Sequence, residues 1–95
     1  MFNKLKNFKE LKNQAKQIQS QLAEVTEEGS GAWGKVKITM NGNQEVISVN
    51  IDQELLNDQN KIQDGVKEAT NDAVKKVQRA AAMKMQQSGM SFPGM

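Results

Sequence analysis

The chain of 95 residues has no cysteine, no histidine and no tyrosine, and it holds a single proline. Without cysteine it lacks disulfides, thiolate nucleophiles and thiolate metal sites. Without histidine it lacks the side chain that most often acts as a general base near neutral pH. No catalytic motif takes their place, so we expect no enzyme, bound metal, cofactor or small-molecule substrate.

Long apolar runs are also missing. Apolar residues make up 37% of the chain and the mean hydropathy is -0.70. No stretch approaches the roughly 18 to 20 consecutive apolar residues of a membrane span, and the first residues show no signal-peptide segment. We therefore expect a cytoplasmic protein with no membrane partner. So few large apolar side chains make a small core, and we expect association with a second copy.

The net charge of +2 is distributed unevenly along the chain. Residues 1–16 hold five lysines and one acid, residues 17–60 hold two lysines and seven acids, and residues 61–95 hold six basic groups and three acids. Both ends of the chain are therefore basic and its middle is acidic. This distribution favours a polyanionic partner for the two ends.

Apolar residues in the first quarter of the chain are separated by steps of three and four. They are Phe8, Leu11, Ala15, Ile18, Leu22 and Val25. This spacing predicts a helix with a heptad stripe, and Lys9, Lys12 and Lys16 project from a different side of it. Because one narrow stripe cannot close a core, we expect it to lie against another helix or a sheet. The helix should end between residues 25 and 28.

Two strands are predicted by alternation of polar and apolar residues, over residues 35–40 and 45–51. The Asn41-Gly42 dipeptide between them is the one best suited to a type I′ hairpin turn. Upstream, the glycine-rich residues 29–34 interrupt the helix and form a turn, a bulged strand or both.

A second helix follows the hairpin. Asp52 is expected to cap a short turn, and Asn57 or Asp58 to cap the helix. Its apolar face consists mostly of small residues: Ile62, Val66, Ala69, Ala73, Val77 and Ala80. Gly65 costs about 1 kcal/mol relative to alanine inside a helix. It therefore indicates either a close contact or a weak first turn.

The predicted order of helix, two or three strands and helix defines an α+β fold. We expect one domain over residues 1–87 and a flexible tail over residues 88–95. The methionines of the C-terminal region either form an adaptable partner surface or belong to a loose tail, and we favour the tail. They are Met83, Met85, Met90 and Met95.

Three segments in this order resemble the YbaB/EbfC family: residues 36–42, residues 46–52 leading into Leu55-Leu56, and residues 69–73. The resemblance covers nearly the whole chain. It implies an α-β-β-β-α protomer with an antiparallel sheet, which pairs into a tweezer-like homodimer with two projecting helices per protomer. Three residues depart from the usual pattern of the family: Trp33, Lys35 and Gly65.

The resemblance also implies a nucleoid-associated protein that binds double-stranded DNA with little sequence preference, with the projecting helices in contact with DNA. Lysine dominates over arginine on the basic faces, which suits phosphate contacts better than base recognition. A solvated helix face is the alternative for any single lysine. Asp72 is placed to pair with Lys75 or Lys76, which leaves Arg79 the freer cation. The candidate DNA-binding residues are Lys4, Lys6, Lys9, Lys12, Lys16, Lys75, Lys76, Arg79 and Lys84.

The single tryptophan, Trp33, either stacks on a base or anchors a dimer interface. We favour the interface, because aromatic platforms serve mainly single strands. The residues expected at this interface are Trp33, Val36, Ile38, Ile47 and Val49. The alternative function is a non-catalytic adaptor whose heptad stripe and Met-rich tail dock onto a recombination or replication protein. Pull-down after nuclease treatment separates this function from DNA binding.

Overall fold

The computed structural model describes residues 2–87, with side chains from Phe8 onward. Its elements are α1 (Phe2–Ala23), β1 (Thr26–Gly31), β2 (Val36–Asn41), β3 (Val46–Ile51), the short 3-10 helix η1 (Gln53–Leu55) and α2 (Gln59–Gln87). This order confirms the predicted α+β fold and its α-β-β-β-α sequence of elements. The expected tail, residues 88–95, lies outside the described residues.

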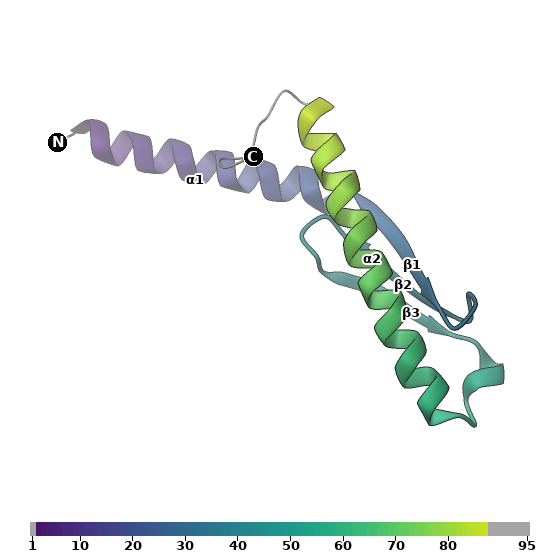
Figure 1. Cartoon of the computed structure of the whole chain (residues 1–95). Coiled ribbons are helices and arrows are strands. Elements are labelled where there is room, and N and C mark those ends of the chain that lie inside the picture. Colours follow the sequence, from purple (N-terminus) through teal and green to yellow (C-terminus); the bar gives the residue numbers. More distant parts are fainter. Residues whose placement is uncertain (1, 88–95) are drawn as a thin grey trace.

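The three strands form one antiparallel sheet in the order β1-β2-β3, and α2 lies over the β1 and β2 side of it (Figure 1). Alternation puts every second side chain of β2 under α2. The small residues of α2 let the helix approach the sheet closely. The buried core consists of Val36, Ile38, Met40, Leu55, Ala69, Ala73 and Val77.

The α1 helix leaves the body as an arm, and the molecule measures 63 × 23 × 20 Å (Figure 1). Phe8 and Leu11 in its heptad stripe are 66% and 63% exposed. The expectation that this stripe lies against another element is therefore wrong for the single protomer. The resemblance implies that both helices project from the body, but α2 packs on the sheet. Only its end reaches α1, where Lys84 Nζ lies 3.3 Å from Glu24 Oε2.

The first helix ends at Ala23, before the predicted limits of residues 25 to 28. The chain turns early because Thr26 already pairs with Asn41 at the start of β1. Long-range pairing thus overrides the helical pattern at its last position. The glycine-rich residues 29–34 contribute both a strand end and the turn that follows it.

The β2–β3 hairpin is confirmed, but its type I′ turn is not. Positive φ falls on Gln44 (62°), not on Asn41 or Gly42. The Gly42 N–H instead lies 2.9 Å from the carbonyl oxygen of Leu22 at the end of α1. A Cβ at Gly42 would lie 2.6 Å from that oxygen. Glycine is needed here for close approach, and the contact fixes the base of the arm to the hairpin.

Both predicted caps are present: Asp52 Oδ1 accepts from Glu54 N–H (2.9 Å) and Asp58 Oδ1 accepts from Lys61 N–H (3.1 Å). Gly65 marks a close contact, because an added Cβ would lie 2.6 Å from Val36 Cγ2. Met85 lies within α2 and is 2% exposed, so its assignment to a loose tail is wrong.

Side chains of α2 also cover the outer edge of β1. Edge strands carry unpaired backbone groups that can pair with another chain. Along this edge, backbone groups of three alternate residues form hydrogen bonds with side chains of α2. The contacts are Ser30 N–H to Asp72 (3.0 Å), Ala32 N–H to Glu68 (3.3 Å) and Lys76 Nζ to the Glu28 carbonyl (3.3 Å). Further pairing along this edge is therefore blocked.

Asp72 is expected to stabilise the fold only above its ordinary pKa near 3.8. The Ser30 N–H, and after it the Lys76 ammonium, lower the pKa of this carboxyl group in the folded chain. A lowered folded pKa gives stability that is present above the unfolded value and lost as pH falls through the folded one. Asp72→Ala should therefore cost about 1 kcal/mol at neutral pH, a small value because the side chain is 35% exposed.

Urea unfolding at pH 7 and at pH 3 measures this contribution. The difference between wild type and Asp72→Ala should shrink at the lower pH. Asp64→Ala is the control, since Asp64 lies on the same helix and has no hydrogen bond or ion pair within the described residues. A cost for Asp72→Ala that is unchanged between the two pH values would contradict the charged cap.

Candidate nucleic-acid interface

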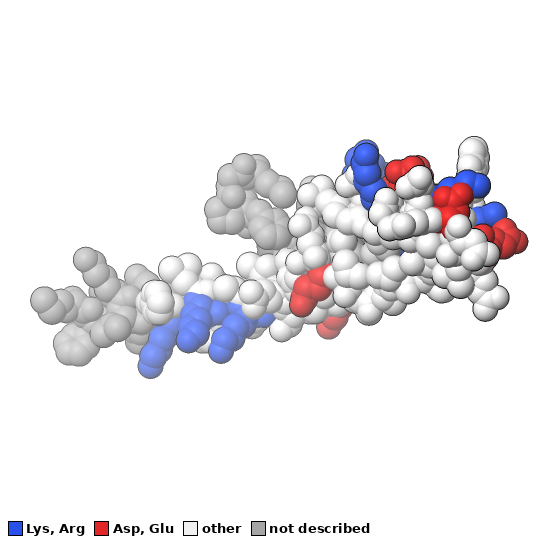
Figure 2. Space-filling model, turned by 90° about the horizontal axis from the view of Figure 1, so that it is seen from below, with Lys and Arg blue, Asp and Glu red and all other residues white. Residues whose placement is uncertain are grey.

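The basic side chains of α1 stand in a row along the arm. Lys9, Lys12 and Lys16 are exposed, and none has an ion pair within the described side chains. Steps of three and four keep the three lysines on one side of the helix, along about 10 Å of its axis. On the face of the arm seen in Figure 2, basic side chains stand together with no acidic side chain between them. Lys4 and Lys6 lie outside the described side chains.

The basic residues of α2 fall into two groups. Lys75 and Arg79 are exposed, one helical turn apart, and form no ion pair within residues 8–87. Lys76 pairs with Asp72 (3.0 Å), as expected from their spacing, and Lys84 pairs with Glu24 (3.3 Å). Such exposed pairs are weak. In the C-terminal half of α2 the free cations are therefore Lys75 and Arg79, while Lys67, nearer the start of the helix, is also exposed and has no ion pair within the described residues.

The C-terminal half of α2, with Lys75 and Arg79, lies toward the end of the sheet from which the arm leaves. The contact between Lys84 and Glu24 places the last turns of α2 beside the base of α1 (Figure 1). Arg79 lies five residues before Lys84, about 7.5 Å along the helix axis. The two basic stretches, about 60 residues apart in the sequence, thus lie on either side of the contact between the end of α2 and the base of α1.

Four of the five residues expected at a dimer interface fall into two pairs. Val36 and Ile38 are 0% and 2% exposed beneath α2 and offer no surface to a second copy. Ile47 and Val49 on β3 are 55% and 53% exposed. The alternation in the sequence could not distinguish the buried pair from the exposed pair. Ile38 and Val49 are neighbours on one face of the sheet, and α2 covers only Ile38.

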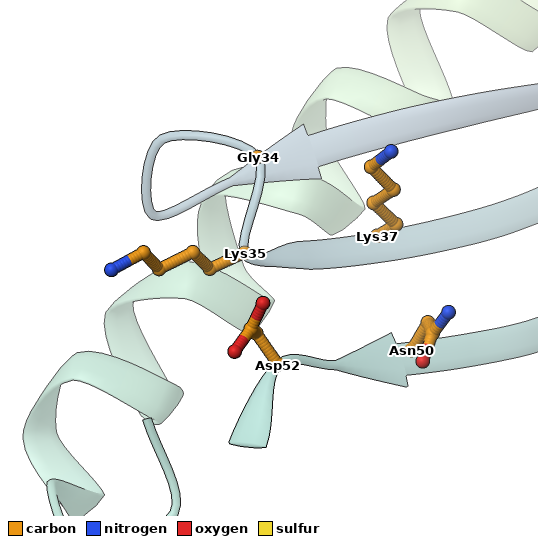
Figure 3. Close-up of a pocket in the computed structure, with 5 residues that line it drawn as sticks. All are labelled: Gly34, Lys35, Lys37, Asn50 and Asp52. Atoms are coloured by element: carbon orange, nitrogen blue, oxygen red, sulfur yellow. The ribbon is translucent and has the colours of Figure 1, made fainter. Parts of the chain in front are cut away.

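A hollow of about 220 Å³ opens on the other face of the sheet, lined by Gly34, Lys35, Lys37, Asn50 and Asp52 (Figure 3). Lys35 points away from the other lining residues and pairs with Glu54 at 2.6 Å. The Glu54 carboxylate raises the pKa of Lys35, so this lysine stays charged and does not act as a base. The hollow thus shows no set of groups that fits a reaction.

The described residues hold no group of three acidic, histidine or cysteine side chains placed to bind a metal ion. None of the helices in the described part is long and apolar enough to cross a membrane.

Residues 1–91 match the model of the YbaB/EbfC DNA-binding family. The chain belongs to this family. The match confirms the resemblance found in the sequence, and it puts the basic arm in a family defined by DNA binding. Bacterial relatives of this chain are named nucleoid-associated proteins.

A nucleoid-associated protein of Coxiella burnetii is 35% identical over 91 residues, covering 95% of this chain and 83% of the relative. One from Syntrophobacter fumaroxidans is 35% identical over 99% of this chain and 89% of its own length. One from Geobacillus is 40% identical over 79% and 73%.

The fold recurs in a crystal structure of an uncharacterized Helicobacter pylori protein. The TM-score is 0.65 at 22% identity, and the similarity covers 85% of this chain and 96% of the other. At this level of identity the similarity supports the fold alone. The family arrangement of helices and strands is therefore found in a solved structure.

Proposed function

We propose that this chain binds double-stranded DNA with little sequence preference, through phosphate contacts from the free cations of α1 and α2. The observation that carries the proposal is that Lys9, Lys12, Lys16 and Arg79 are exposed and have no ion pair within the described residues of a YbaB/EbfC chain. Unpaired ammonium and guanidinium groups can exchange with the counterions of DNA without breaking an existing ion pair.

Phosphate contact, and not base reading, fits the chemistry of this surface. Three of these four side chains are lysines, which act as point charges, whereas bidentate recognition of bases needs arginine, asparagine or glutamine. Among the free cations only Arg79 has a forked group. A single arginine positions a duplex better than it discriminates sequence.

We propose further that the binding unit is a homodimer joined through β3. The outer edge of β1 is covered by α2, so β3 is the sheet edge left to pair with a second copy. Its Val46, Ile47 and Val49 are 52%, 55% and 53% exposed. A symmetric contact would bury this apolar set and give four basic helices per molecule.

A salt titration on random-sequence duplex tests the DNA proposal. The logarithm of the binding constant should fall linearly with the logarithm of salt concentration, with a slope near -0.9 per phosphate neutralised. Fluorescence anisotropy between about 0.05 and 0.3 M salt measures the slope. Duplexes of unrelated sequence should give the same affinity. No binding at the lowest salt rejects the proposal and favours the adaptor.

Val49→Lys is expected to separate the dimer. A charge placed in the centre of an apolar interface cannot be paired when both copies carry it. Sedimentation equilibrium should then give the protomer mass of 10.6 kDa in place of twice that value. DNA affinity should fall although a positive charge is added, because only half of the contacts remain.

Leu56→Lys is the matched control for this variant. Leu56 is 63% exposed but lies after η1, away from β3. Leu56→Lys adds the same charge at an exposed apolar site and should leave the dimer intact. A dimer that survives Val49→Lys, or one lost equally in both variants, would place the interface elsewhere.

A further inference from the structure

The loop between β1 and β2 presents a tryptophan to solvent at the end of the sheet opposite the arm. Trp33 is 100% exposed, and its φ is 59°. The preceding Ala32 also has positive φ, 52°. Neither residue type favours this left-handed conformation, which suits glycine and asparagine. The loop therefore maintains an unfavourable backbone conformation at Ala32 and Trp33, although the Trp33 side chain contributes nothing to the protomer core. Strained backbone of this kind is common at binding sites.

A hollow of about 240 Å³ lies beside this ring, between the loop, η1 and the first turns of α2. Trp33, Ala32 and Leu55 supply its apolar lining, and the charged residues that line it are Asp64, Glu68, Lys35 and Lys61. Its volume suits one large apolar side chain from outside the protomer. The hollow and Trp33 together form a site with apolar and charged lining, which we name the tip.

The charge at the tip is negative. Residues 32–35 and 52–68 contain five carboxylates and three lysines. Two of these lysines are already paired, Lys35 with Glu54 (2.6 Å) and Lys61 with Asp58 (3.9 Å). Asp64 has no hydrogen bond or ion pair within the described residues. The tip thus repels phosphate and attracts a cation, which argues against Trp33 stacking on DNA.

The complementary surface is at the other end of the same chain. On α1, Phe8 and Leu11 are 66% and 63% exposed and no element of the protomer covers them. Lys12 lies one helical turn after Phe8 and so borders the apolar stripe. Lys9 and Lys16 project further from it. The arm therefore offers large apolar side chains flanked by positive charge. This charge is opposite in sign to the net charge of the tip.

We propose that the tip receives the α1 arm of a second copy, with Phe8 or Leu11 seated against Trp33 and Lys12 facing the carboxylates. Because the two surfaces differ, the contact is heterologous, and each copy so joined still offers an unused arm or tip. Copies therefore add end to end. Lys9 and Lys16 stay open to a polyanion, so DNA binding and chain growth share only Lys12 on the arm.

Sedimentation velocity over a range of protein concentrations, without DNA, tests the contact. The wild type should grow beyond its smallest species as concentration rises, and growth should weaken between about 0.05 and 0.5 M salt. Trp33→Asn should abolish the growth, and it keeps the fold because asparagine tolerates positive φ. Met83→Gln, which removes a 55% exposed apolar side chain from α2, should grow as the wild type does.

Mixing two variants distinguishes the heterologous contact from any other. Leu11→Gln should also stop growth, since it removes the arm's apolar surface and leaves the tip intact. This test rests on the β3-joined homodimer proposed above. An equimolar mixture of Leu11→Gln and Trp33→Asn should grow again, because each Leu11→Gln dimer supplies two tips and each Trp33→Asn dimer supplies two arms, whereas single protomers would stop at a pair. Growth of Trp33→Asn alone, a mixture that stays small, or a Leu11→Gln variant that falls apart into protomers would each overturn the proposal.

Discussion

DNA affinity is expected to fall by at least about 100-fold at ~0.15 M salt when four free cations of the arm and α2 become glutamine. The four residues are Lys9, Lys12, Lys16 and Arg79. Each phosphate contact adds a salt-dependent contribution through counterion release, and in a dimer the four substitutions remove eight charges. The salt slope should become less steep for the same reason. The fold should be unaffected, because these side chains are exposed and unpaired within the described residues.

A control of equal charge separates location from total charge. Changing Lys35, Lys37, Lys61 and Lys67 to glutamine alters the net charge by the same amount, but these residues lie on the body and near the tip. Anisotropy titrations of both variants on two unrelated duplexes provide the comparison. Equal losses in the two variants would mean that overall charge, and not the arm, drives binding. A loss on only one duplex would indicate base recognition.

Local patterns predicted the elements of this fold because each pattern reflects a local cause. Alternation predicted β2 and β3, and the side chains of Asp52 and Asp58 predicted two caps, since a cap joins residues two or three apart. The pairing of Asp72 with Lys76 followed from the helical repeat in the same way. These contacts depend on neighbours in the sequence.

Contacts between distant residues were missed by the same patterns. Asp72 receives its hydrogen bond from Ser30, 42 residues away, and no local pattern marks that contact. The β1 edge, the exposed face of β3 and the early end of α1 depend on where α2 and β2 lie. Alternation in the sequence predicted the same apolar strand face for Val36 and Val49, although Val36 is buried and Val49 is exposed.

The candidate site shows the same division. Charge counts located the basic ends of the chain, and helical spacing placed Lys9, Lys12 and Lys16 on one side. Which cations are free was decided by packing, since Lys84 meets Glu24 only because the end of α2 lies beside the base of α1. Trp33 was assigned to an interface from its type alone. Its positive φ and the acidic residues around it became visible only in three dimensions.

Gly29→Ala is expected to destabilise the fold by at least about 3 kcal/mol, at the upper end of the usual cost of overpacking. The added Cβ would overlap the Ala69 carbonyl oxygen and the Ala73 nitrogen, and it would lie 2.7 Å from Ala73 Cα. These are backbone atoms of α2, so no side-chain rotation can relieve the overlap. The helix must move away from β1.

Gly34→Ala is the control for this overlap. Both variants replace glycine by alanine, so the effect of the substitution on the unfolded chain is the same in both and cancels in the comparison. Nothing lies within 4 Å of a Cβ at Gly34, so only its positive φ (86°) should cost about 1 kcal/mol. Urea unfolding followed by circular dichroism measures both. Displacing α2 from β1 also releases the Ser30 contact with Asp72 and exposes a second sheet edge. Gly29→Ala should therefore aggregate where Gly34→Ala does not, and equal stabilities would mean that α2 does not approach β1 as closely as described.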